Sequence, residues 1–145
     1  MTIGIGNDHH GVLAKQNLTK YLTNKGYNVV NYGTDELENV DYCDYAFKVG
    51  EEVRDGKIDF GILLCNTGIG MSIACNKVRG VRCAKVANEY EASMTRRDND
   101  ANVIALSAKL GIEEIERIID KFLNTNYMSI ERYNRRKEKI DNYDT

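Results

Sequence analysis

The chain has 145 residues and a formal net charge of −2 at pH 7, which favours one domain over residues 1–145 with a sizeable core. The weak negative charge argues against nucleic acid as a partner, and no apolar stretch approaches the roughly 20 residues of a membrane span. The first residues enter an apolar segment without a signal peptide, and the four cysteines form no CxxC pair, so we expect a cytoplasmic, reduced protein without a metal site.

Short apolar segments alternate with segments of helical periodicity along the chain. In chain order we expect a strand at 2–6, a helix at about 12–25, a strand at 27–32, an acidic loop at 33–40, a helix at about 42–54, a strand at 59–64, a loop and helix at 65–77, a strand at 81–86, a helix at 88–97, a strand at 102–106, a helix at 112–123, and a charged helical tail from 127 onward. There is no internal repeat and no low-complexity linker.

This alternation indicates right-handed βαβ units and a parallel sheet. We predict an α/β fold, three-layered and Rossmann-like, with five strands in the flavodoxin-like order 2-1-3-4-5 and a C-terminal helical tail at 127–145. In that order the direction in which successive strands are added reverses between the first and third strands, and ligands bind at such a switch point. The turn after residues 2–6 and the loop after 59–64 should therefore line one crevice.

The loop at 65–72, CNTGIGMS, carries the first candidate chemistry. Its two glycines let backbone N–H groups converge beside a helix N-terminus, which makes a nest for negative charge. Cys65 ends the strand beside that nest. A buried cysteine is commonly packing, but amide donors stabilise a thiolate and favour a reactive role. The loop lacks GxGxxG and a lysine-bearing P-loop, so an oxyanion cradle fits better than a nucleotide loop or a plain turn.

Two further groups of side chains are candidates. Asp8 and His9 follow the first strand and are commonly a helix cap and a surface residue, but the predicted crevice suits them for sugar hydroxyls and phosphate. His10 is expected to face away. Arg132 and Arg136 share one face of the tail helix, which is either a solvated surface or a bidentate phosphate site. We assign the other three cysteines to structure: Cys43, Cys75 and Cys83.

Four segments of the chain resemble one known family. They are DH at 8–9, CNTGIGMSIACNK at 65–77, NDANV at 99–103 and RYNRR at 132–136. In order and spacing they are similar to the ribose-5-phosphate isomerase B and galactose-6-phosphate isomerase family, and the resemblance covers essentially the whole chain. It implies aldose–ketose isomerisation of a sugar phosphate through a cis-enediolate, without a cofactor or metal. The favoured reaction is ribose 5-phosphate to ribulose 5-phosphate.

The resemblance also assigns roles by position. Cys65 matches the base that moves a proton between C1 and C2, since the Glu used by another branch of the family is Met71 here. Thr67 would assist. The enediolate would be held by the amides of Asn66, Gly68, Ile69 and Gly70. The phosphate would contact His9, Lys109, Arg132 and Arg136. The sugar hydroxyls would contact Asp8 and Asn99. Family members share this site across a homodimer, with the Asn99 segment supplied by the partner, and often pair dimers into tetramers. The tail at 127–145 would contribute to the phosphate site and to the dimer.

Three positions depart from the family pattern. The ring-opening His of the family is Asp98 here, the Gly after the catalytic cysteine is Asn66, and an Arg-His pair in the tail reads Arg132-Tyr133. Asp98 would serve as an acid–base catalyst only with a raised pKa, because the ordinary value is about 3.9. Otherwise the substrate has no ring form, as with a tetrose phosphate, or a partner subunit supplies the missing group.

Other substrates and other classes of function remain open at this point. Galactose or allose 6-phosphate and tetrose phosphates are alternative substrates. Two further alternatives are a non-autonomous subunit of a hetero-oligomeric isomerase and a sugar-phosphate-binding regulatory protein without activity. A flavodoxin-like nucleotide or flavin binder is disfavoured by the cysteine at the loop rim.

Overall fold

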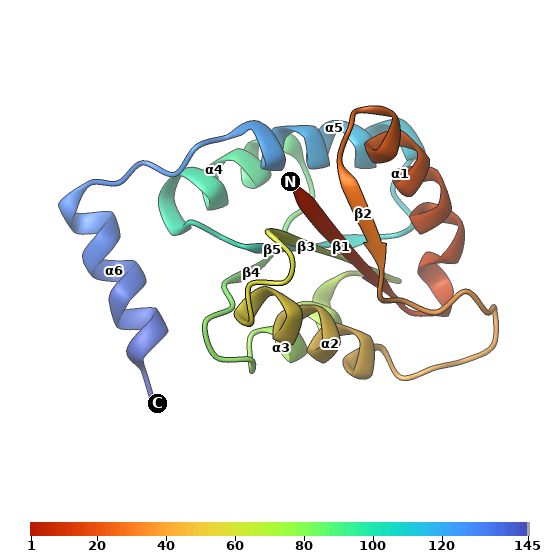
Figure 1. The fold of residues 1–145 in the computed structure, drawn as a ribbon, viewed down its shortest axis with the longest axis horizontal. Coiled ribbons are helices and arrows are strands. Elements are labelled where there is room, and N and C mark those ends of the chain that lie inside the picture. Colours follow the sequence, from red (N-terminus) through yellow and green to blue (C-terminus); the bar gives the residue numbers. More distant parts are fainter. Residues whose placement is uncertain (145) are drawn as a thin grey trace.

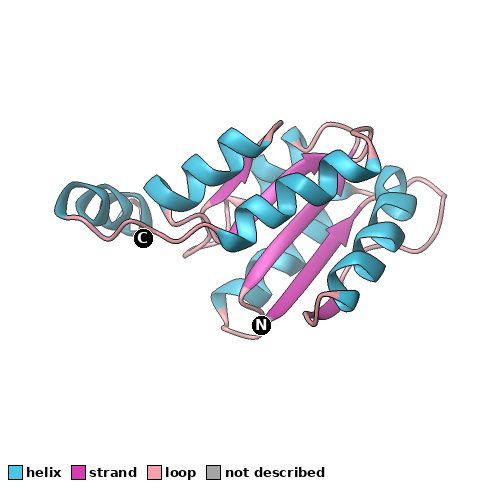
Figure 2. Ribbon diagram, turned by 90° about the horizontal axis from the view of Figure 1, so that it is seen from above, coloured by secondary structure: helices cyan, strands magenta, loops and turns pink. Residues whose placement is uncertain are grey.

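The apolar segments form a five-stranded sheet in which every neighbouring pair of strands is parallel. The structure is a computed structural model and describes residues 1–144. The strands are β1 (Thr2–Asn7), β2 (Asn28–Asn31), β3 (Phe60–Cys65), β4 (Cys83–Lys85) and β5 (Val103–Ser107). The helices are the short 3-10 helix η1 (His9–Gly11), α1 (Val12–Asn24), α2 (Tyr42–Arg54), α3 (Ile69–Cys75), α4 (Glu89–Asn99), α5 (Ile112–Asn124) and α6 (Glu131–Asn142). Helices cover both faces of the sheet (Figures 1 and 2), so the predicted three-layer α/β class is confirmed.

The strand order is β2-β1-β3-β5-β4, so the predicted order 2-1-3-4-5 is wrong for the last two strands. The switch point between β1 and β3 is as expected. The exchange follows from burial, because β5 buries four of its five residues, whereas β4 has three residues and none is buried. An apolar strand takes the central place and a short, partly exposed one takes the edge. The exchange brings the end of β5 beside β3, where Cys65 pairs with Ser107.

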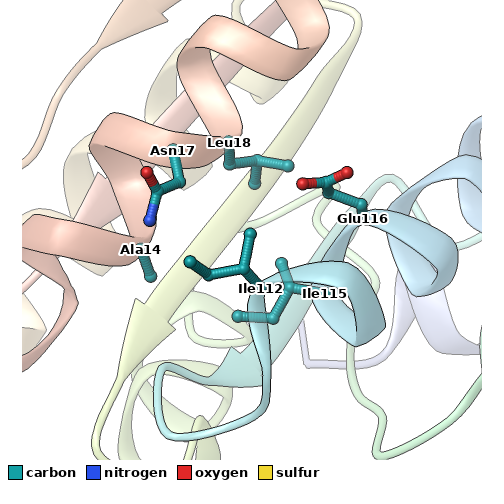
Figure 3. A pocket seen from close by; sticks show the side chains of 6 residues that line it. All are labelled: Ala14, Asn17, Leu18, Ile112, Ile115 and Glu116. Carbon is teal, nitrogen blue, oxygen red and sulfur yellow. The ribbon is translucent and has the colours of Figure 1, made fainter.

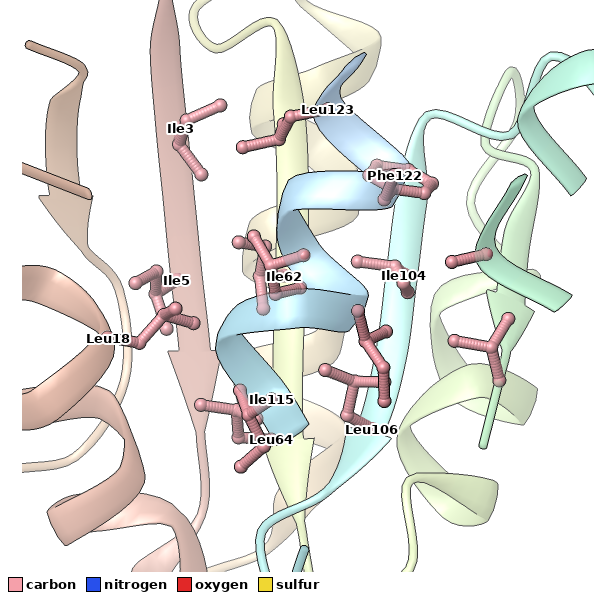
Figure 4. Packing of buried hydrophobic residues seen from close by; sticks show 14 of the residues in the cluster. Ile3, Ile5, Leu18, Ile62, Leu64, Ile104, Leu106, Ile115, Phe122 and Leu123 are labelled. Atoms are coloured by element: carbon pink, nitrogen blue, oxygen red, sulfur yellow. The ribbon is translucent and has the colours of Figure 1, made fainter. Parts of the chain in front are cut away.

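Each face of the sheet has its own hydrophobic cluster. Figure 4 shows one of them, in which Ile3, Ile62 and Ile104 pack beneath α5. The apolar side chains of α5 recur at helical spacing, and Phe122 is fully buried at the cluster's edge against Phe60. The second cluster packs α2 and α3 on the opposite face. Among the described residues, no helix has both the length and the apolar character required to cross a bilayer.

A small hollow lies where α1 meets α5 (Figure 3). Its volume is about 10 Å³, and Leu18, Ile112 and Ile115 line much of it. That volume is close to the space needed by one water molecule, so a metabolite does not fit between these helices. The candidate site therefore lies elsewhere on the molecule.

Polar contacts hold the C-terminal helix α6, which stands at the side of the molecule (Figure 1) and has no buried residue. The Lys137 ammonium lies 2.9 Å from a carboxylate oxygen of Asp100, and an Arg82 guanidinium nitrogen lies 2.9 Å from Asp141. Lys137 also lies over the ring of Tyr127. These ion pairs fix where α6 presents its arginines relative to α4.

Candidate active site

The carboxyl ends of β1 and β3 lie side by side and bring two predicted segments together. The backbone amide of Asp8 donates to the carbonyl of Leu64, the residue before Cys65, at 3.2 Å. The Asp8 side chain then caps η1 by accepting from the His10 amide at 3.0 Å, and Asp8 is only 4% exposed. The sequence prediction that the Asp8 turn and the Cys65 loop share one edge of the sheet is confirmed.

The two histidines lie against each other and against Asp8. Their ring centroids are 4.1 Å apart, and the Val40 amide donates to Nδ1 of His9 at 3.3 Å. His10 was expected to face away, but its Nδ1 lies 3.2 Å from Asp8 Oδ2, so that expectation is wrong. The His10 ring folds back onto the carboxylate that caps η1, and the His9 ring lies against the His10 ring. The ligand-type atoms of residues 8–10 lie within 4.8 Å of one another and are joined by these contacts.

The Cys65 thiol faces a backbone amide donor. Cys65 is 4% exposed at the end of β3, and the Gly68 amide donates to its Sγ at 3.1 Å. A backbone N–H acts only as a donor, so the sulfur is the acceptor of this bond. Thr67 Oγ1 accepts from the Ile69 amide at 3.1 Å and so fixes the next turn of the loop. The next amides of α3, those of Gly70 and Met71, have no intrahelical acceptor and are available to an anion.

Glycine is required at 68 for two reasons. Its φ is +81°, and a Cβ there would lie 2.9 Å from the carbonyl carbon of Leu106. We expect Gly68→Ala to lower the free energy of unfolding by about 2 kcal/mol through backbone strain and crowding. The matched control is Gly111→Ala, where φ is −60° and a Cβ meets nothing within 4 Å. Urea unfolding measures both, and an equal stability of the two variants would contradict the assigned loop geometry.

The segment after β5 forms the third side of the Cys65 loop. The Ala108 amide donates to the carbonyl of Cys65 at 2.8 Å, and Ser107 Oγ donates to the carbonyl of Asn66 at 2.7 Å. The Lys109 amide donates back to Ser107 Oγ, which places Lys109 at the rim of the loop. Sequence reasoning missed Ser107 because its position depends on the exchanged order of β4 and β5.

A second group of predicted residues meets at a different place. Asp98 and Asn99 end α4, and together with Arg132, Tyr133 and Arg136 of α6 they line a hollow of about 230 Å³. The Arg97 guanidinium, 2.7 Å from Asp98, holds the pKa of that carboxyl below its ordinary value. Asp98 is therefore ionised at neutral pH and carries no proton to donate. Arg132 stacks over the ring of Tyr133 at 4.9 Å.

A single chain keeps the two groups apart. The hollow lies near the amino ends of the strands, since α4 ends at Asn99 and the Asn102 carbonyl accepts from Gly61 at the start of β3. Cys65 is the last residue of β3, and a strand of six residues is about 17 Å long. Asp8, His9, Cys65 and Lys109 thus lie at one edge of the sheet. Asp98, Asn99, Arg132 and Arg136 lie at the other.

Cys75 and Met71 belong to the second hydrophobic cluster, and Cys83 packs against it. A hydrogen bond with Cys75, together with burial, raises the pKa of the Cys83 thiol well above its ordinary value. Cys75 and Met71 are fully buried in the cluster beneath α2 and α3. All four cysteines are free of disulfides. These surroundings agree with a structural assignment for Cys75 and Cys83.

Residues 3–140 match the family model described as Ribose/Galactose Isomerase. The chain belongs to this family. It is 38% identical over 126 residues to ribose-5-phosphate isomerase B of Escherichia coli, covering 86% of this chain and 85% of that protein. It is 41% identical over 129 residues to D-erythrulose-4-phosphate isomerase of Pectobacterium atrosepticum, covering 88% of this chain and 85% of that protein. The structure of Mycoplasma genitalium ribose-5-phosphate isomerase B with bound ribulose 5-phosphate superposes with a TM-score of 0.92 at 39% identity. The superposition covers 98% of this chain and 95% of that one.

Membership of the ribose/galactose isomerase family confirms the resemblance seen in the four motifs and the enzyme class expected from it, an isomerase of sugar phosphates. The matched region spans β1 to α6, so it includes both the Cys65 edge and the Arg132 edge. The named relatives act on phosphorylated sugars of different lengths. Family membership therefore leaves the length of this isomerase's own substrate open.

Proposed function

We propose that the chain interconverts an aldose phosphate and a ketose phosphate, with ribose 5-phosphate and ribulose 5-phosphate as the favoured pair. The observation that carries the proposal is the Cys65 thiol, held at 3.1 Å from the Gly68 amide where β3 meets α3. The relatives in Escherichia coli and Mycoplasma genitalium support the five-carbon substrate by their names and by the bound ribulose 5-phosphate of the latter.

The proposed chemistry is a proton transfer within the substrate. The C2 proton of an aldose is weakly acidic, so its removal needs both a positioned base and stabilised charge on oxygen. The Cys65 thiolate takes this proton, and the electron pair moves into a C1–C2 double bond with the charge on the carbonyl oxygen. The amides between Asn66 and Gly70, assisted by Thr67, hold this enediolate. Return of the proton to C1, with the hydroxyl proton passing between O2 and O1, gives the ketose.

Two copies of the chain complete the site in this proposal. One chain supplies the Cys65 loop, with His9 and Lys109 toward the phosphate of the substrate. The partner chain supplies the arginines of α6 to the same phosphate, and its Asn99 faces the Cys65 loop. The separation of the two groups along β3 in a single chain supports this sharing. A homodimer, or a tetramer of two dimers, is the expected assembly.

A tetrose 4-phosphate is the second candidate substrate, and the ionisation of Asp98 favours it. Ring opening of a pentose needs a group that gives and takes protons, whereas the Arg97 guanidinium lowers the pKa of Asp98. A tetrose 4-phosphate carries its phosphate on the oxygen that would close a furanose ring, so it stays open. The Pectobacterium atrosepticum relative, which acts on D-erythrulose 4-phosphate by its name, supports this candidate.

Turnover of tetrose, pentose and hexose phosphates by the wild type and by Asp98→His decides between these substrates. If ring opening limits the wild type, we expect Asp98→His to raise kcat/KM for ribose 5-phosphate by about tenfold or more, with no gain for the open tetrose. Asp98→Asn is the control, since it removes the charge without adding a proton carrier. No gain on the cyclic sugar would contradict a ring-opening role for position 98. The absence of turnover on all three sugars would contradict the proposed function.

A further inference from the structure

A buried lysine outside the predicted site lies close to it in the fold. The Lys15 side chain on α1 is 4% exposed, and its ammonium donates to the Thr34 carbonyl at 2.6 Å and to Asp35 Oδ1 at 2.5 Å. Burial of an ammonium is costly unless partners satisfy it, and an apolar side chain would fill this space at lower cost. Lys15 therefore has a role other than filling space in the core.

The partners of Lys15 belong to one end of the loop at residues 33–41. Asn7, the last residue of β1, donates from Nδ2 to the same Thr34 carbonyl at 3.0 Å. Gly33 passes so close to Asn7 that a Cβ on it would lie 1.7 Å from Asn7 Oδ1. Asp35 is held a second time by Asn31 at 3.0 Å. This end of the loop is fixed to β1, β2 and α1 by one side chain from each.

The other end of the same loop reaches the site. The Val40 amide donates to Nδ1 of His9, and a backbone N–H acts only as a donor. The nitrogen that accepts from Val40 carries no hydrogen in this arrangement, which places the ring N–H at Nε2. Nε2–H is a hydrogen-bond donor for an oxygen of the substrate.

We infer that Lys15 is a positioning residue for His9. By anchoring residues 34 and 35 it holds the loop over η1, so that the Val40 amide selects the Nε2–H tautomer of His9. The Lys15 ammonium itself faces the carbonyl of Thr34 and the carboxylate of Asp35, with the amide of Asn7 beside them. The effect on turnover rests on the proposed function, while the effect on the His9 tautomer does not.

Lys15→Met tests this inference, because methionine retains most of the side-chain volume and Thr34 keeps its bond from Asn7. Nitrogen-15 NMR of the imidazoles at mildly alkaline pH reports which His9 nitrogen carries the proton. We expect the variant to populate both tautomers, and KM for ribose 5-phosphate to rise about tenfold with kcat changed far less, as for a lost binding contact. Lys20→Met, an exposed position on the same helix, is the matched control and should change neither readout.

A second variant acts on the loop without touching the lysine. Val40→Pro removes the N–H donor itself, and we expect the same rise in the Nδ1–H population of His9. A His9 that stays in the Nε2–H tautomer in either variant would overturn the inference, as would a wild-type KM in Lys15→Met. If the wild type turns over no sugar phosphate but Lys15→Met still alters the tautomer, the proposed function fails and the positioning role stands.

Discussion

Cys65→Ala is expected to lower kcat by about a thousandfold or more, with little change in KM, because it removes the proposed base and leaves the binding groups in place. Cys65 is almost fully buried, so the lost sulfur also creates a small cavity, and we expect a stability loss of about 1 kcal/mol. Initial rates of aldose–ketose interconversion measure the activity. Thermal unfolding separates the loss of the base from a loss of folded protein.

Cys43→Ala is the matched control for this prediction. Cys43 is a half-buried free cysteine on α2 and packs against the second cluster. The Cys43→Ala variant should retain wild-type kcat. Substantial turnover by folded Cys65→Ala would mean that another group removes the C2 proton.

Mixed dimers are expected to recover activity that neither parent shows. One parent is Cys65→Ala, and the other is the double variant Arg132→Ala, Arg136→Ala, which lacks the guanidinium groups on α6. If each site takes its thiol from one chain and its arginines from the other, a mixed dimer holds one intact site. An equal mixture after subunit exchange should then reach about a quarter of wild-type activity, since half of the dimers are mixed.

The matched control for the mixing experiment pairs two changes at the same edge of the sheet. Asp8 lies beside the Cys65 loop, so mixtures of Asp8→Ala with Cys65→Ala leave no site intact and should stay inactive. Native mass spectrometry confirms that exchange has taken place. Fully exchanged mixtures of the first pair without recovered activity would contradict a site shared between subunits.

The sequence was sufficient for the parts of the fold that depend on local pattern. The helix at 42–54 has the predicted bounds, and the other helices and strands differ by only a few residues at their ends, because apolar periodicity and turn residues act within a few positions. The Cys65 loop was also predictable, since its glycines and its place after a buried strand are local features. Gly68 does take the left-handed conformation that such a turn requires.

The features that were not predicted depend on contacts between distant segments. The order of β4 and β5 depends on how much of each strand is buried, and Ser107 reaches Asn66 only because β5 lies beside β3. His10 turned toward Asp8 because the Asp8 carboxylate caps η1 and lies within reach of both the amide and the ring of His10, which spacing alone does not reveal. The Arg97 contact that keeps Asp98 ionised depends on side-chain conformations at the end of α4.

The role of Lys15 was hidden for a similar reason. In the sequence it is one of several lysines on an amphipathic helix, where a charged side chain is commonly solvated. Only the fold shows that its ammonium is buried against the loop at 33–41. Lys15 lies on the buried side of α1, and the periodicity of the sequence did not predict a charged residue there.

Solvent exchange at the reacting carbons tests most directly whether Cys65 moves the proton. In deuterium oxide, the wild type should place deuterium at C2 of the aldose and C1 of the ketose of the sugar phosphate that it turns over, as followed by proton NMR. Cys65→Ala should bind the same sugar phosphate, seen as line broadening of the substrate signals, and should exchange no proton above the rate without enzyme. Exchange at the wild-type rate in Cys65→Ala would contradict the assignment of this thiol as the base.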